Sequence, residues 1–113
     1  MIDVSEDQFT GPLPKDMCKG GNLELLLLLN NSFTGDLRES YGDCKNLLRF
    51  RVNINNLKGK VPKGIWGLPR VNIIDLSFNK FVGEIGPEIR NAKNISQLYI
   101  NNNYFFGTLV LEI

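Results

Sequence analysis

The sequence contains no histidine among its 113 residues, which excludes Ser-His-Asp and Cys-His catalysis, histidine metal sites and histidine pH switches. Its two cysteines are too few for a four-cysteine zinc site or for a disulfide-dense mini-protein. Thirteen basic residues against twelve acidic ones leave a net charge of +1, so there is no bulk attraction to nucleic acid or to an anionic membrane. The longest apolar run, residues 25–29, is far shorter than the roughly 20 residues that span a bilayer.

Two further signals are missing. The first six residues contain neither a basic n-region nor an apolar h-region, so no signal peptide is expected. No inward-facing pair of carboxylates, glycine-rich phosphate loop or other catalytic constellation stands out, so we expect no enzyme activity, no cofactor and no metal. What remains is a binding or structural chain that is rich in leucine (16), asparagine (14) and glycine (11).

The chain is an internal repeat with a period of 24 residues. Five glycines mark it: Gly11, Gly35, Gly59, Gly83 and Gly107. Four residues before each glycine lie Asp7, Asn31, Asn55, Asn79 and Asn103. With the apolar positions, the pattern is L-x-x-L-x-L-x-x-N-x-L-x-G-x-I-P, the leucine-rich repeat, and it runs without an insertion. It predicts a right-handed α/β-class solenoid over residues 1–113, with about five coils, a parallel concave sheet, and a convex side of loops and short helical turns.

The spacing explains the residue types. The L-x-L pair alternates at period two, as in a short strand with one buried face, and each strand lies about 4.8 Å from the next. The following asparagine turns inward, where its amide can pair with backbone groups of its own coil and of a neighbouring coil. We therefore predict a ladder of Asn31, Asn55, Asn79 and Asn103. Asp7 cannot donate when ionised, so the first coil should be weaker. The glycine permits a tight bend with positive φ.

The segments Gly11-Pro12-Leu13-Pro14 and Gly59-Lys60-Val61-Pro62 resemble the plant-specific class of extracellular leucine-rich repeats, which form the ectodomains of plant receptor-like kinases. The segments at 44–52, 67–69, 73–77 and 16–21 are similar to the peptide-hormone receptor kinases that include receptors for C-terminally encoded peptides and abscission peptides. The resemblance covers nearly the whole chain. It implies a secreted peptide ligand, a co-receptor kinase as a further partner, and a place on the extracellular face of the plasma membrane in a longer parent.

Arg49 and Arg51 flank the inward-facing Phe50, so both project from the concave face, about 6.6 Å apart along the strand. Two guanidiniums at that spacing can hold one carboxylate. In the resembling receptors, an Arg-x-Arg pair on this face binds the C-terminal carboxylate of the peptide. The alternative is a solvated basic pair that Asp75, one coil on, neutralises.

The residues that point outward between the core positions supply the remaining candidates. An outward strip of Leu25, Leu27 and Leu29 is either a contact surface or the product of an ambiguous register within the leucine run. Ile54 continues the apolar surface beside the arginines. The concave-face contacts are predicted to be Leu25, Leu27, Leu29, Asn53, Ile73, Asp75, Ser77, Phe78 and Tyr99.

Covalent features remain open at this stage. Cys18 and Cys44 are one coil plus two residues apart, so they form either a disulfide or two buried small hydrophobes. Two N-glycosylation sequons begin at Asn30 and Asn94. A glycan at Asn30 would crowd the concave rim, which favours Asn94. Trp66 is expected to pack on the convex side.

Three functions remain as hypotheses. The first is a peptide-recognition segment of a plant receptor-like kinase. The second is a repeat module that binds another protein, such as a cell-wall enzyme inhibitor or a co-receptor contact. The third is a truncated product with no function of its own, because neither end of the array carries a polar cap. On this view the chain is a fragment of a longer protein.

Overall fold

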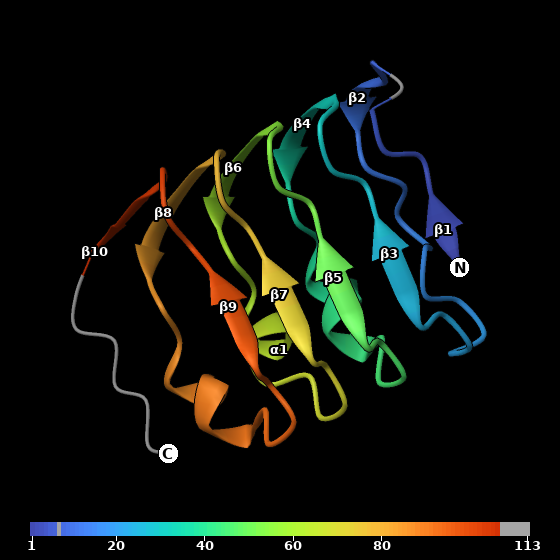
Figure 1. Ribbon diagram of the computed structural model, residues 1–113, viewed down its shortest axis with the longest axis vertical. Coiled ribbons are helices and arrows are strands. Elements are labelled where there is room, and N and C mark those ends of the chain that lie inside the picture. Colours follow the sequence, from blue (N-terminus) through green and yellow to red (C-terminus); the bar gives the residue numbers. More distant parts are fainter. Residues whose placement is uncertain (7, 107–113) are drawn as a thin grey trace.

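Each repeat folds into one coil, and each coil contributes a strand to two parallel sheets (Figure 1). The computed structural model describes residues 1–6 and 8–106. Asp7 and Gly107 therefore lie outside the described residues. The strand order is β1-β3-β5-β7-β9 in the first sheet and β10-β8-β6-β4-β2 in the second, so each strand pairs with the equivalent strand of the neighbouring coil. This topology confirms the predicted leucine-rich repeat solenoid.

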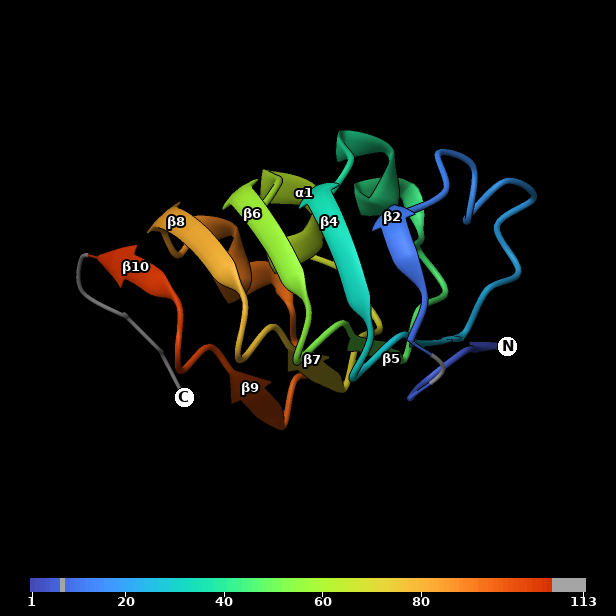
Figure 2. The same ribbon diagram turned by 90° about the horizontal axis from the view of Figure 1, so that it is seen from above.

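The first, concave sheet consists of β1 (Ile2–Asp3), β3 (Leu25–Leu27), β5 (Arg49–Arg51), β7 (Ile73–Asp75) and β9 (Gln97–Tyr99). The second sheet consists of β2 (Thr10–Pro12), β4 (Ser32–Asp36), β6 (Asn56–Lys60), β8 (Lys80–Glu84) and β10 (Tyr104–Phe106). The short helices are η1 (Glu39–Asp43), α1 (Lys63–Trp66) and η2 (Pro87–Asn91). Figure 2 shows the second sheet as one row of strands, with β5, β7 and β9 in another layer.

The second sheet is absent from the sequence-based prediction, which places a tight bend at each repeat glycine. Gly59 has the expected positive φ of 79°, but it lies inside strand β6 rather than in a turn. Glycine has a low propensity for β-strands, so the repeat pattern does not predict a second sheet at these positions. A close contact also favours glycine at position 59. A Cβ at Gly59 would lie 2.9 Å from Oδ1 of Asp36, which belongs to the preceding coil.

The core lies between the two sheets and the short helices. Its largest fully buried side chains include Trp66, Tyr41, Phe50 and Phe81. The predicted convex position of Trp66 corresponds to helix α1, where its ring meets that of Phe105 edge-on at 5.9 Å. The helices pack closely because Gly42 in η1 lies against Gly64 in α1, where an added Cβ would approach backbone within 2.9 Å.

An asparagine amide joins each coil to the one before it. Nδ2 of Asn55 donates to the carbonyls of Leu28 and Val52, both at 3.0 Å, and Oδ1 accepts the N–H of Phe33 at 3.1 Å. The same three kinds of bond recur at Asn31, Asn79 and Asn103. The ladder thus satisfies backbone groups that the turn after each concave strand leaves unpaired.

Candidate functional site

Strand β5 places two arginines on one face of the concave sheet. Phe50 between them is fully buried, whereas Arg49 is exposed and Arg51 is partly exposed. The period-two alternation of the strand therefore projects both guanidiniums from the same side. Among the described residues, Arg49 makes no ion pair or side-chain hydrogen bond that would neutralise it.

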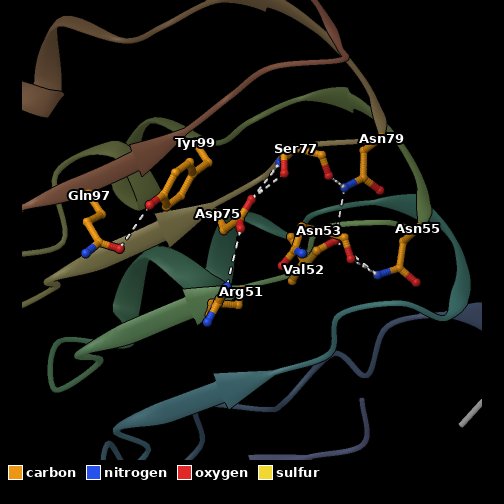
Figure 3. A network of polar contacts seen from close by, with 9 residues as sticks. All are labelled: Arg51, Val52, Asn53, Asn55, Asp75, Ser77, Asn79, Gln97 and Tyr99. Atoms are coloured by element: carbon orange, nitrogen blue, oxygen red, sulfur yellow. Dashed lines mark hydrogen bonds and ion pairs between the residues drawn. The ribbon is translucent and has the colours of Figure 1, made fainter. Parts of the chain in front are cut away.

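Arg51 has a partner in the next coil. Its Nη2 lies 3.7 Å from Oδ2 of Asp75, whose side chain is 8% exposed against 35% for Arg51. The other oxygen, Oδ1 of Asp75, accepts the hydroxyl of Ser77 at 2.6 Å and its N–H at 3.1 Å (Figure 3). Ser77 thus fixes the carboxylate, and the carboxylate orients Arg51. Asp75 pairs with Arg51, as the second alternative expects, and this ion pair does not involve Arg49.

The leucine run has one definite register. Leu26 and Leu28 are buried, whereas Leu25, Leu27 and Leu29 are half-buried on the concave face. The sheet pairs Leu25 with Arg49 and Leu27 with Arg51. An apolar strip therefore lies directly beside the arginine pair.

The other predicted contact residues fall into two groups. Phe78 and Tyr99 are 51% and 42% exposed, and the hydroxyl of Tyr99 lies 3.2 Å from Oε1 of Gln97. Four more keep only 6–9% of their surface exposed, so they form the floor of the face rather than its surface: Asn53, Ile73, Asp75 and Ser77. Outward direction along a strand does not reveal this burial, which depends on the side chains of neighbouring coils.

Sequence reasoning missed one backbone feature at the edge of this face. The residue before each ladder position adopts the left-handed conformation, with φ of 63° at Glu6, 56° at Asn30, 58° at Ile54, 57° at Phe78 and 58° at Asn102. Asparagine, which tolerates this conformation, occupies two of these positions, and its recurrence there is the sequence signal that could have predicted the left-handed backbone. Ile54 is 43% exposed.

The cysteines form a covalent link, and the two sequons lie at different places in the repeat. Cys18 and Cys44 are joined by a disulfide, with Cα atoms 5.3 Å apart. Asn94 is exposed in the turn before β9. Asn30 is exposed at the end of the concave face, in the position that precedes the ladder.

A cleft of about 720 Å³ lies elsewhere, at the convex edge of the second and third coils. Its lining carries charges of both signs, from Asp36, Glu39, Lys60 and Lys63, and includes none of the predicted contact residues. Within residues 1–6 and 8–106, no helix is long and apolar enough to cross a bilayer. In the same part of the chain, no group of three potential His, Cys, Asp or Glu ligands is placed to hold a metal ion.

No protein-family model matches the chain. It is 33% identical over 111 residues to receptor-like protein 13 of Arabidopsis thaliana, a match covering 96% of this chain and 10% of the relative. It is 34% identical over 115 residues to the leucine-rich repeat receptor protein kinase MSL1 of Oryza sativa subsp. japonica, covering 83% of this chain and 8% of the relative. The chain thus spans a tenth or less of these curated relatives.

A solved structure is similar over nearly the same stretch. This is the Arabidopsis receptor kinase HAESA in complex with the peptide hormone IDA and the co-receptor SERK1. The identity is 44% and the TM-score 0.91, over 92% of this chain and 17% of that chain. At this identity, the likeness extends beyond a shared fold to the sequence of the repeats.

Proposed function

We propose that this chain, a leucine-rich repeat segment of the kind found in the ectodomains of plant receptor-like kinases and receptor-like proteins, recognises an extended peptide on its concave sheet. The free C-terminal carboxylate of the peptide is held at Arg49 and Arg51. The observation that carries the proposal is the pair of guanidiniums on one face of β5, on either side of buried Phe50. The similar HAESA ectodomain, which was solved with a peptide hormone, supports a ligand of this class.

The charges at the site match one carboxylate. Two guanidiniums and the Asp75 carboxylate leave one uncompensated positive charge, and that charge is nearest Arg49. Asp75 holds Arg51 in a fixed orientation, so less side-chain freedom is lost when a ligand binds. Arg49 then supplies the stronger attraction, and Arg51 supplies a positioned donor fork.

The surroundings suit the rest of a peptide. Leu25 and Leu27 present half-buried apolar surface directly beside Arg49 and Arg51. Tyr99 adds an exposed ring two coils from the arginines, and tyrosine contributes contact area at a low entropic cost. A charged anchor next to an apolar strip is the arrangement that selects the end of a chain with apolar side chains.

The test uses the 113-residue chain and a synthetic library of 12-residue peptides with free C-terminal carboxylates. Sequences that bind are resynthesised as acid and as C-terminal amide, and their Kd values are measured by isothermal titration calorimetry. We expect the amide to bind about 10- to 100-fold more weakly, because charge-assisted hydrogen bonds contribute roughly 1.5–3 kcal/mol each. Arg49→Gln should cause a similar loss with the acid peptide and little further loss with the amide.

Arg90→Gln is the matched control, because it removes the same charge from an exposed position in η2, on the convex side. It should leave the Kd unchanged. Equal affinity for acid and amide would refute the carboxylate contact. Large losses from Leu25→Ser and Leu27→Ser, together with no loss from Arg49→Gln, would favour the second candidate, a protein partner bound through the leucine strip.

A further inference from the structure

Ile54 and Phe78 have an unfavourable backbone conformation. Both adopt the left-handed region, with φ of 58° and 57°. This region is costly for side chains with a Cβ, and a β-branched or bulky residue found there is an outlier. Such strain persists only where the surrounding structure imposes it, and it concentrates at functional sites.

The repeat imposes this conformation independently of the side chain. The N–H of Ile54 donates to the carbonyl of Ser77 at 2.9 Å, and its own carbonyl accepts the N–H of Asn31 at 3.1 Å. At Phe78 the equivalent bonds, to the carbonyl of Asn101 and from the N–H of Asn55, measure 3.1 and 3.2 Å. These inter-coil bonds fix the peptide units on both sides of the residue.

The chain contains the lower-cost solution at the same position of other coils. Asn30 and Asn102 have φ of 56° and 58°, and asparagine visits this region readily. Backbone geometry therefore does not explain the apolar residues at 54 and 78. Core packing does not explain them either, because Ile54 and Phe78 are 43% and 51% exposed.

Other unfavourable features lie beside Ile54. In the described part of the chain, three buried side-chain polar atoms lack a hydrogen-bond partner. Two of them, Nε of Arg51 and Oδ1 of Asn53, lie on the same coil within three residues of Ile54. The third, Oε2 of Glu88, lies in η2 on the convex side. Unpaired buried polar groups are destabilising, so two unfavourable features, the strained backbone and these unpaired atoms, occur together on the coil that carries the arginines.

We propose that Ile54 and Phe78 form a contact rim that takes an apolar side chain of the bound peptide. This inference rests on the proposed function, because the occupant is identified from the exposed positive charge of Arg49 on the same coil. An anionic chain end held at Arg49 leaves the preceding residues within reach of the rim. Ile54 follows Arg49 by five positions, at most about 16 Å of extended chain. The apolar side chain is therefore within about five residues of the peptide's C-terminus.

The first test is stability. Ile54→Asn and Phe78→Asn should each raise the Tm of the 113-residue chain by about 4 °C, because asparagine relieves the strain. Asn102→Ile, the reverse change at the same repeat position, should lower it. Val82→Asn is the matched control, since Val82 is 40% exposed but lies in β8 of the other sheet without a positive φ. Its Tm should not rise. If the Tm values of Ile54→Asn and Phe78→Asn also fail to rise above that of the unsubstituted chain, the strain argument is wrong.

The second test is selectivity, with the same library of 12-residue peptides with free carboxylates. The unsubstituted chain should enrich aliphatic or aromatic residues at one position within about five residues of the C-terminus. The double variant Ile54→Asn/Phe78→Asn should lose that enrichment about tenfold and keep its preference for acid over amide, whereas Val82→Asn should keep both.

The two readouts separate the two proposals. Loss of the acid preference in Arg49→Gln with retained apolar enrichment supports the rim. If the acid and amide bind equally but the apolar enrichment disappears in the double variant, the carboxylate contact is wrong and the rim is right. Unchanged enrichment in the double variant overturns the rim, whatever the acid preference.

Discussion

The first coil and the middle coils of the solenoid are held in place by different interactions. In the third and fourth coils the inward residues, such as Val52 and Leu76, are fully buried. In the first coil, Ile2 and Val4 are only partly buried and Phe9 is 48% exposed. The middle coils have a neighbour on each side, whereas the first has one within this chain, so apolar packing contributes less to it.

The first coil has additional covalent and polar links to the second. The disulfide between Cys18 and Cys44 connects the two coils on the convex side. The hydroxyl of Tyr41 donates to the carbonyl of Pro14, and that of Ser40 to the carbonyl of Lys15. The ladder bonds recur in the buried middle coils, whereas the first coil has less apolar burial and additional links to its neighbour.

The largest expected effect comes from breaking the ladder in the middle. Asn55→Leu removes the bonds to Leu28, Val52 and Phe33 at a site only 8% exposed, so the backbone groups left behind cannot reach water. We expect the free energy of unfolding to fall by about 4 kcal/mol. Urea unfolding of the variant and the parent chain measures the difference.

Asn31→Leu is the matched change nearer the N-terminal end. Asn31 makes the equivalent bonds but is only half-buried, so water can replace some of them, and we expect roughly half the loss. Equal losses at the two positions would contradict the idea that burial decides the value of the ladder.

Much of the fold could be predicted because its signal is repeated five times. One insertion-free period fixes the strands, the inward residues and the ladder, and the positions of Asn31 and Gly35 are enough to fix the register of the leucine run. The second sheet could not be predicted, because Gly59 and its equivalents combine a positive φ with strand pairing, which single-residue preferences assign to turns.

The sequence predicts on which face of the sheet the candidate side chains lie, but not how deeply neighbouring coils bury them. Alternation around Phe50 places Arg49 and Arg51 on one face, and column position places Asp75 near Arg51. The burial of Asn53 depends on the side chains of adjacent coils, and the left-handed conformation of Ile54 depends on inter-coil backbone bonds. Neither quantity is encoded in any single repeat.

The next effect sharpens the comparison at the first coil. Cys18→Ala/Cys44→Ala should lower the free energy of unfolding by roughly 3 kcal/mol, because the disulfide restricts a long loop of the unfolded chain. Hydrogen exchange should locate the loss. The N–H of Val4, which donates to Leu27, should lose more protection than the N–H of Leu76, which donates to Tyr99 in the last concave strand. Dithiothreitol should destabilise the parent chain and leave the double variant unaffected. A uniform loss of protection in both coils would contradict a local role for the link.

The smallest effect concerns Tyr41, the polar link from the second coil to Pro14. Burial raises the pKa of Tyr41 from 10.0 to about 12, although the nearby positive charge of Arg38 acts in the opposite direction. The folded state therefore holds the phenolic proton more tightly than the unfolded state does. This contribution to stability is fully present below about pH 10 and is lost as the pH rises from about 10 to about 12.

Tyr41→Phe should cost about 1 kcal/mol near pH 8, through the lost hydrogen bond. It should also remove this part of the alkaline loss, so the difference between the two proteins narrows between pH 10 and 11. Tyr99 and Tyr104 are exposed and present in both proteins, so urea unfolding at pH 8, 10 and 11 isolates Tyr41. If the difference in the free energy of unfolding stays constant with pH, the ionisation of Tyr41 does not contribute to the alkaline loss of stability.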